Sequence, residues 1–302
     1  MGWIARQSRP DISLYVSQGQ SAVSKATVKD LKLANQGLEL AHQHSDKGIY
    51  FSSDAISWDD MVVVTVTDAS FAQETVKEPD GTEKPHRTQK AFMNLLVNPK
   101  ILKEEKAGCH IWCWRSLTDK RVCRATLQGE AHGMLSGTEM GDRLRAIICD
   151  CKGMLPDLRD WQRVSSESMR HLWLTDCASL VQHLQNPKNE RLENVRLSID
   201  IQGLKQMLWE KADGTNLDEL LPAEVAENAV RWIDTSCMIV DCLTKRMNPE
   251  VMHQLMANGV LDLKPTVESQ MLKLRKAKLR KDKKIKEHTA AACKASKAKS
   301  SI

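Results

Sequence analysis

Apolar and polar positions follow two different periods along this chain, and the first half changes from one period to the other. Between residues 28 and 41 apolar side chains recur every three or four positions, which predicts an amphipathic helix within a helical segment over residues 1–48. Residues 61–66 are apolar almost without interruption, as expected for a strand buried on both faces. Shorter apolar runs predict further strands at residues 49–51, 91–97, 110–114 and 121–125.

The second half of the chain alternates helical and strand patterns. Helices are expected at residues 127–148, 177–184, 190–210 and 240–243. Strands are expected at residues 171–175 and 229–233, while a turn and an acidic loop are expected at residues 78–82 and 211–227. Strands that come first and then alternate with helices favour an α/β or α+β fold with a mixed sheet.

The formal net charge of +5 is distributed unevenly. Residues 264–302 contain thirteen Lys and Arg against three acidic residues, a net of +10, so residues 1–263 carry about −5. This tail is expected to be either a solvated helix or disordered, and either a nucleic-acid-binding element or a bystander. Its candidate nucleic-acid-binding residues are Lys273, Arg275, Lys276, Lys278, Arg280 and Lys281.

Nine cysteines at irregular spacings do not suggest a disulfide framework. No segment resembles a signal peptide or a membrane span, so we expect reduced thiols and an intracellular protein, cytoplasmic or nuclear. The cysteines at 109–113 and 149–151 match no standard zinc spacing, which favours packed thiols over metal ligands. Five tryptophans fall in predicted core elements and are interpreted as core residues, with base stacking by one of them as the alternative: Trp112, Trp114, Trp173, Trp209 and Trp232.

Four acidic residues lie in apolar surroundings. Asp68 and Asp176 each end an apolar run, and Glu130 falls on the apolar stripe of the predicted helix 127–148. Asp200 lies between two isoleucines. A carboxylate in such a setting is costly unless a counter-charge neutralises it, and a divalent metal is the usual shared counter-charge. The structural alternative is that Asp176 caps the following helix and Asp200 faces solvent.

A series of short motifs occurs along the chain. They are SRPDI at 8–12 with VS at 16–17, TDAS at 67–70, WRSLTDKRV at 114–122 with ATLQGEA at 125–131, LTDCASL at 174–180, LSIDI at 197–201 and VDCLTK at 240–245. The first two resemble the end of the reverse transcriptase and the others the ribonuclease H domain of copia-type retrotransposon polyproteins, in the order that they take there.

This resemblance implies a ribonuclease H-like fold: a mixed, mainly five-stranded sheet flanked by helices. It divides the chain into a reverse transcriptase remnant (residues 1–50), a ribonuclease H-like domain (51–262) and the basic tail (263–302). No Tyr-x-Asp-Asp motif is present, so no polymerase activity is expected.

The resemblance also implies a metal-dependent endonuclease that cleaves the RNA strand of RNA–DNA hybrids. Its cofactor would be two Mg²⁺ ions, with Mn²⁺ as an alternative, and its products a 5′-phosphate and a 3′-hydroxyl. In this interpretation Asp68 bridges the ions, Glu130 and Asp176 hold the ion on the leaving-group side, and Asp200 holds the ion that activates water. The partners would be the hybrid and a possible separate reverse transcriptase, with no membrane and no small-molecule substrate.

Three positions depart from the family pattern. Ser70 and Gln128 replace acidic residues, and Ser198 replaces a histidine. These changes keep a second hypothesis open, in which the chain is a decayed retroelement fragment that folds and retains only residual nucleic-acid binding.

Overall fold

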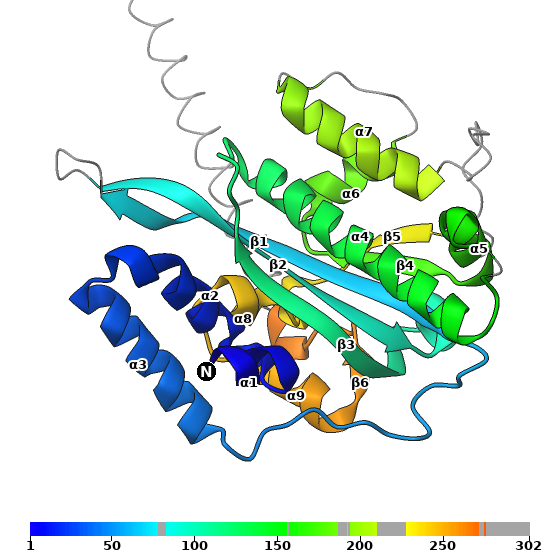
Figure 1. Cartoon of the computed structure of the whole chain (residues 1–302), viewed down its shortest axis with the longest axis horizontal. Coiled ribbons are helices and arrows are strands. Elements are labelled where there is room, and N and C mark those ends of the chain that lie inside the picture. Colours follow the sequence, from blue (N-terminus) through cyan, green and yellow to red (C-terminus); the bar gives the residue numbers. More distant parts are fainter. Residues whose placement is uncertain are drawn as a thin grey trace, which may run out of the picture. The chain divides into compact units, whose positions relative to one another are not determined.

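A curled, mixed six-stranded sheet forms the centre of the computed structural model, which describes residues 1–77, 83–155, 157–186, 192, 194–209, 228–271 and 275 (Figure 1). The strands are β1 (Val62–Lys77), β2 (Glu83–Val97), β3 (Lys106–Thr118), β4 (His171–Thr175), β5 (Asn228–Trp232) and β6 (Val260–Asp262). Their order is β5-β4-β1-β2-β3-β6. The first three strands pair antiparallel, β4 and β5 run parallel to β1, and β6 adds an antiparallel edge.

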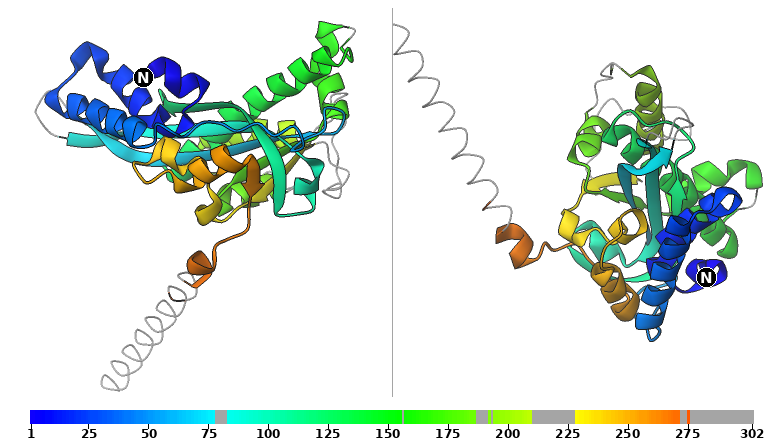
Figure 2. Two further views of the ribbon diagram at one scale, coloured as in Figure 1. Left: turned by 90° about the horizontal axis from the view of Figure 1, so that it is seen from below. Right: turned by 90° about the vertical axis from the view of Figure 1, so that its left-hand side faces the viewer.

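Helices cover both faces of this sheet (Figures 1 and 2). One face carries α4 (Thr126–Cys151), α5 (Trp161–Ser168), α6 (Ala178–Gln185) and α7 (Val195–Trp209). The other face carries α8 (Asp241–Thr244), α9 (Glu250–Asn258) and the N-terminal helices α1 (Gly2–Gln7), α2 (Ser13–Ala22) and α3 (Val28–Gln43). Short 3₁₀ turns occupy Pro10–Ile12, Val23–Lys25, Pro99–Leu102, Leu158–Asp160 and Thr235–Cys237.

Strand β1 is buried on both faces, as its apolar run predicts. Val62, Val64 and Val66 pack into the core that includes Leu243 of α8. The alternate residue Val63 packs on the opposite face, against side chains from α4. This two-sided burial explains why the segment reads as a continuous apolar run and not as an alternating one.

Helix α4 packs directly on the sheet along four glycines that follow one another at intervals of four residues. They are Gly129, Gly133, Gly137 and Gly141. A Cβ built on Gly137 would come within 2.9 Å of Thr65, Thr67 and Phe92. Only the absence of a side chain at this spacing lets the helix backbone rest on the strands.

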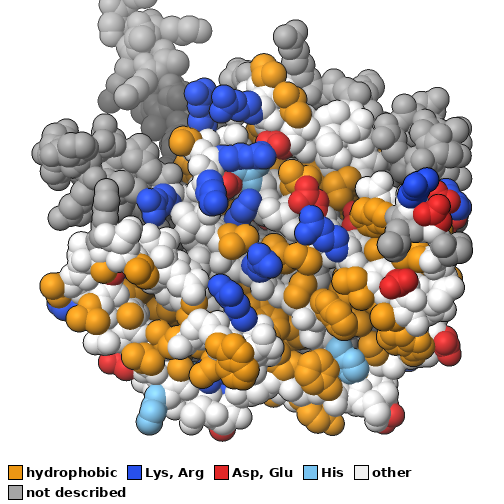
Figure 3. Space-filling model, in the orientation of Figure 1, with side chains coloured by type: hydrophobic (Ala, Val, Ile, Leu, Met, Phe, Trp, Pro, Cys, Tyr) orange, Lys and Arg blue, Asp and Glu red, His pale blue; other side chains and the backbone are white. Residues whose placement is uncertain are grey.

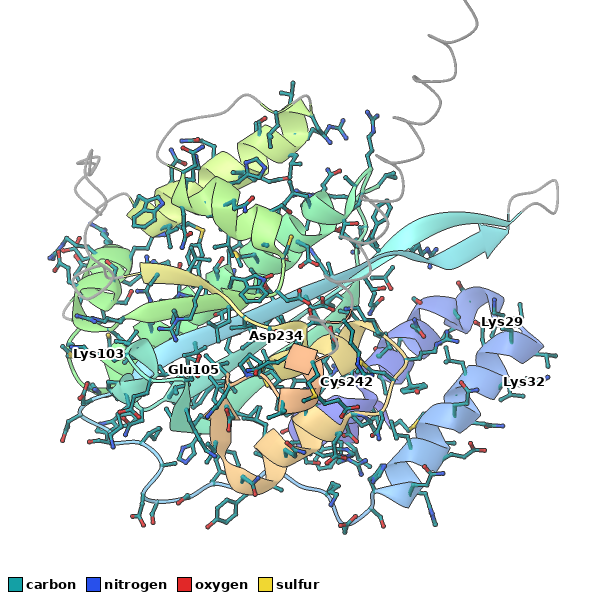
Figure 4. All side chains as sticks on the ribbon, turned by 180° about the vertical axis from the view of Figure 1, so that it is seen from behind. Lys29, Lys32, Lys103, Glu105, Asp234 and Cys242 are labelled. Atoms are coloured by element: carbon teal, nitrogen blue, oxygen red, sulfur yellow. The ribbon has the colours of Figure 1, made fainter. Side chains whose placement is uncertain are left out.

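The N-terminal helices pack on the body of the molecule through a buried ion-pair cluster. Arg9 donates to Asp11 at 2.7 and 2.8 Å, and Asp11 also contacts Nε2 of His253 on α9 at 3.0 Å. Burial opposes the charge of Asp11, but the hydrogen bonds from Arg9 and His253 hold the pKa of its carboxyl below the ordinary value. Figure 4 shows Cys242 on α8 within the body, whereas Lys29 and Lys32 project from α3 at the outer edge.

Residues 1–263 form one compact unit and residues 264–302 form a second. The interpretation of residues 1–50 as a reverse transcriptase remnant stays a prediction. No helix within the described part of the chain is long and apolar enough to span a membrane.

Most predicted elements are confirmed, and the errors have local causes. The strand at 171–175 is correct to the residue, and the long helix is α4. Residues 49–51 and 121–125 are not strands, because neither run pairs with a neighbouring strand, and the edge strand β6 was missed. The predicted turn at 78–82 and loop at 211–227 lie outside the described residues.

Candidate functional site

Asp68 and Asp176 lie side by side because β1 and β4 are parallel and in register. The last pair of this register joins Val66 to Leu174, and each aspartate lies two residues further along its own strand. Positions two residues apart point to the same face, so both carboxylates reach the same point where β4 ends. Asp68 is buried, with 1% of its surface exposed, and Asp176 is half-buried.

Glu130 joins these two carboxylates from the first turns of α4. One carboxylate oxygen from each of Asp68, Glu130 and Asp176 lies within 4.8 Å of the others. The side chain of Glu130 is buried, and its Oε2 has no hydrogen-bond partner among the described residues. The glycine stripe of α4 favours this approach, since a Cβ on Gly129, the neighbour of Glu130, would come within 2.8 Å of the γ-methyl of Thr88.

A fourth acid that the sequence interpretation did not select, Asp241, reaches the same place from α8. Lys245 links it to the cluster: its Nζ lies 2.7 Å from Oδ1 of Asp241 and 3.4 Å from Oδ1 of Asp68. The hydroxyl of Thr244 donates a hydrogen bond to Oδ2 of Asp68. The motif at 240–245 therefore supplies a carboxylate, a hydroxyl and an ammonium group to one site.

The protonation of these acids reflects their crowding. Burial, together with the nearby charges of Asp241 and Asp176, raises the pKa of Asp68 to about 6 despite the opposing effect of Lys245. Burial and the neighbouring carboxylates likewise raise the pKa of Glu130 well above its ordinary value, and burial raises that of Asp241. Burial opposes the charge of Lys245, but Asp68 and Asp241 raise its pKa above the ordinary value.

The donor set fits a hard divalent cation. Three carboxylate oxygens within 4.8 Å of one another are close enough to bind one ion, and a buried oxygen of Glu130 lacks a partner. All the donors are oxygens, the ligand type that Mg²⁺, Ca²⁺ and Mn²⁺ prefer. A cation here would also relieve the mutual repulsion that raises the acids' pKa values.

Asp200 is not brought into this cluster. It lies on α7, where its Oδ2 is 3.0 Å from Nε2 of His132 and its Oδ1 is 3.3 Å from the guanidinium of Arg121. His132 also contacts Asp119 through Nδ1 at 2.6 Å. The hydrogen bond to Asp119 is the main reason that the pKa of His132 rises to about 10, and Asp200 contributes to the rise.

Of the three residues that depart from the motifs, Gln128 and Ser198 make local hydrogen bonds, whereas Ser70 makes none among the described residues. Oε1 of Gln128 accepts a hydrogen bond from the backbone N–H of Arg124 at 3.0 Å, which ties the preceding connection to the first turn of α4. Ser198 bonds the backbone of Leu192. The hydroxyl of Ser70 is buried without a partner among the described residues.

A groove lined by basic side chains lies between the N-terminal helices and β3. Its exposed basic residues are Arg6, Arg87, Arg115, Lys120 and Arg121. Lys and Arg side chains gather across this face of the molecule in Figure 3.

The interpretation of five tryptophans as core residues was wrong for two of them, Trp112 and Trp232, while Trp114 and Trp209 pack against the core as partly buried side chains. Trp173 is fully buried, but Trp112 in the groove is 51% exposed and Trp232 is 43% exposed. Trp112 alternates outward on β3 and Trp232 ends β5, so an apolar side chain within a predicted strand was not enough to place either in the core.

Of the cysteines weighed as zinc ligands, Cys109 and Cys149 are buried, Cys113 is half-buried and Cys151 is exposed. His110 contacts the backbone oxygen of Ser52, and Cys113 donates to Asn94. Burial raises the pKa of Cys109 to about 12 and also raises that of Cys149, which disfavours the thiolate that a metal needs. The eight cysteines that the structure describes are free thiols.

Comparison with known proteins finds weak similarity to solved structures. No family model and no curated protein matches the chain. The N-terminal ribonuclease H domain of a Mycobacterium tuberculosis protein, solved as a fusion with maltose binding protein, aligns at 9% identity over 64% of this chain and 94% of that chain, with a TM-score of 0.30. A foamy viral protease-reverse transcriptase in complex with an RNA/DNA hybrid aligns at 9% identity over 67% of this chain and 21% of that chain, with a TM-score of 0.32.

The mixed sheet flanked by helices, as the strand order and pairing define it, supports the ribonuclease H-like fold.

Proposed function

We propose that the chain is a metal-dependent nuclease that cleaves the RNA strand of RNA–DNA hybrids. The observation that carries this proposal is the convergence of Asp68, Glu130 and Asp176 at the point where β4 ends, with an unpartnered carboxylate oxygen on Glu130. The motif order that resembles copia-type retrotransposons gives the proposal its substrate class. A pair of Mg²⁺ ions would supply Lewis-acid activation of a phosphodiester and of water.

In this proposal Asp68, Glu130 and Asp176 hold the metal. Asp241 takes the fourth position in place of Asp200, because Asp241 shares Lys245 with Asp68 whereas Asp200 is engaged by His132. Lys245 balances the charge of Asp68 and Asp241 and is positioned to meet an anionic phosphate.

The basic groove gives the proposal a surface for the substrate. Its arginines and lysine would contact the phosphate backbone, while discrimination of RNA from DNA would rest on the 2′-hydroxyl and the helix geometry. The exposed ring of Trp112 offers a flat apolar surface in the same groove.

The decisive experiment measures cleavage of a labelled hybrid with Mg²⁺ by the parent chain and three Asp→Asn variants. Asp68→Asn and Asp241→Asn should each lower the cleavage rate about 1,000-fold or more. Each removes a carboxylate whose contribution to transition-state stabilisation at the metal site is several kcal/mol. Asp200→Asn is the matched control and should stay within about tenfold of the parent.

Hybrid binding by each variant is measured in parallel, so that lost cleavage is separated from lost affinity. Equal cleavage by the parent and Asp68→Asn would end the proposal. A parent chain that binds the hybrid without cutting it would support the alternative, a decayed fragment with residual nucleic-acid binding.

A further inference from the structure

A second group of metal-ligating side chains lies outside the carboxylate cluster. Asp119 follows the end of β3, Cys123 lies in the connection to α4, and His132 lies on α4. One ligand atom from each of these three residues lies within 4.8 Å of the other two. Sγ of Cys123 is 3.7 Å from both Oδ2 of Asp119 and Nδ1 of His132, and these two atoms are 2.6 Å apart.

We propose that Asp119, Cys123 and His132 bind one Zn²⁺ ion. A tetrahedral zinc ion with ordinary bond lengths holds sulfur about 3.5 Å from its nitrogen and oxygen ligands, and holds nitrogen and oxygen about 3.4 Å apart. Both sulfur separations are already near that value. The distance between Nδ1 of His132 and Oδ2 of Asp119 must widen by about 0.8 Å, because metal coordination replaces the hydrogen bond between these two atoms.

The surroundings orient each of these donors. The backbone N–H of Arg121 donates to Oδ1 of Asp119 at 3.0 Å, which leaves Oδ2 facing Cys123 and His132. Nε2 of His132 contacts Oδ2 of Asp200 at 3.0 Å. A metal-binding histidine commonly donates its second ring N–H to a carboxylate, which fixes the ring and strengthens the ligand. Asp200 is therefore a positioning residue for His132.

The ligand chemistry selects the class of ion. A thiolate, an imidazole and a carboxylate form a mixed set that suits Zn²⁺, whereas Mg²⁺ prefers oxygen ligands alone. Three protein ligands leave the fourth tetrahedral position for water, and Cys123 is only half-buried. The two sites therefore call for different metals.

Such an ion would fasten the β3–α4 connection onto α4, and through His132 and Asp200 onto α7. Glu130 lies two residues before His132, on the same helix. The site is independent of the proposed nuclease activity, because its ligands belong to a different set of side chains.

The competing explanation is a metal-free ion pair, in which a protonated His132 bridges Asp119 and Asp200. The two explanations differ over Cys123. A bridging imidazolium does not require the thiol, whereas zinc binding does.

The test uses the full chain in the presence of excess Mg²⁺, which occupies the carboxylate cluster. Equilibrium dialysis against Zn²⁺ should recover one ion per chain, and Co²⁺ in its place should give a thiolate-to-metal charge-transfer absorption. Cys123→Ser should abolish that absorption and lower Zn²⁺ affinity at least 100-fold. Asp200→Asn should weaken the affinity about 10- to 100-fold while retaining the absorption.

Cys151→Ser is the matched control, since Cys151 is an exposed free thiol outside both groups of ligands. It should leave the stoichiometry and the absorption unchanged. Absence of stoichiometric Zn²⁺ binding in the parent, or full retention of it in Cys123→Ser, would overturn the proposal and favour the metal-free ion pair. Because the readouts are metal binding and absorption, they stand apart from the outcome of the cleavage assay.

Discussion

At the scale of single residues, Asp68 is held in surroundings that disfavour its charge. It is buried in a strand, close to Asp176 and Asp241, and Lys245 and the hydroxyl of Thr244 oppose the effect of these neighbours and of burial. The folded protein therefore holds a proton on this carboxyl at pH values where the unfolded chain has released it. An acid held in this way makes the stability of the metal-free protein depend on pH and on divalent cations.

We expect the metal-free protein to lose stability as the pH rises through the range from 3.8 to about 6. Below pH 3.8 both states carry the proton, whereas above about 6 the folded state must carry a buried charge that destabilises it. The loss attributable to Asp68 is on the order of 2–3 kcal/mol. Denaturant unfolding at pH 4.5 and 7.5 with a chelator measures it, and added Mg²⁺ should restore stability at pH 7.5 but not at pH 4.5.

Asp68→Asn is the control for this experiment. It should show a flatter pH dependence and a smaller response to Mg²⁺ than the parent. Identical profiles for the two proteins would show that Asp68 does not titrate as described.

At the scale of elements, the contact between α4 and the sheet determines where Glu130 lies. Four glycines remove every side chain from one stripe of the helix, and the strands meet its backbone directly. The contact is tightest at Gly137, where an added Cβ would meet the γ-methyls of Thr65 and Thr67 and the Cβ of Phe92 at 2.8–2.9 Å. The Cβ of Phe92 is fixed to the strand backbone and cannot rotate away.

Gly137→Ala should therefore destabilise the protein by about 1–2 kcal/mol. Overpacking costs about 1–3 kcal/mol, and the better helix propensity of alanine offsets up to about 1 kcal/mol of it. The matched control is Gly203→Ala on α7, where an added Cβ meets nothing within 4 Å. That change should be neutral or stabilising by up to about 1 kcal/mol, and equal destabilisation of both variants in denaturant unfolding would contradict the close approach of α4.

Most helices and strands could be predicted from the sequence, but the side chains that contact each acidic residue could not. β4 was predicted to the residue because its five positions are all buried. The helical phase of residues 190–210 was also correct for α7, but a period gives no partner, so nothing in it tied Asp200 to His132.

Asp241 was overlooked for a related reason. It lies in a helix of four residues, too short for any periodic signal, and its importance comes from contact with Asp68. Thr244 and Asp68, which are in contact, are 176 positions apart along the chain. The place of Asp241 in the motif at 240–245 was the signal that could have identified this residue.

At the scale of the whole molecule, the two compact units differ in charge. Residues 264–302 carry a net of +10, whereas residues 1–263 carry about −5. Of the six candidate nucleic-acid-binding residues in the tail, Arg275 is described and exposed, and Lys273, Lys276, Lys278, Arg280 and Lys281 lie outside the described residues. An electrostatic contribution of the tail to hybrid binding therefore stays a prediction.

Ending the chain at Leu263 should weaken hybrid binding and flatten its dependence on salt. Each phosphate neutralised by the tail contributes about −0.9 to the slope of log K against log salt concentration, so the slope should lose several units. The midpoint of thermal unfolding should stay unchanged, since residues 1–263 form their own compact unit. An unchanged slope in titrations at several salt concentrations would show that the tail is a bystander.

The buried cluster of Arg9, Asp11 and His253 has a consequence for synthesis on the ribosome. Asp11 and His253 are 242 positions apart, so the cluster is completed only after His253 has been made. The N-terminal helices can pack on β3 long before that, since Trp114 of β3 donates to the backbone oxygen of Ala5 at 2.8 Å. Until His253 is present, the buried pair of Arg9 and Asp11 lacks its third member, and the incompletely packed N-terminal segment is more prone to associate with other chains. A nascent chain of this protein therefore passes through a period in which the N-terminal segment lacks its contact with α9. Association with other nascent chains competes with folding during that period.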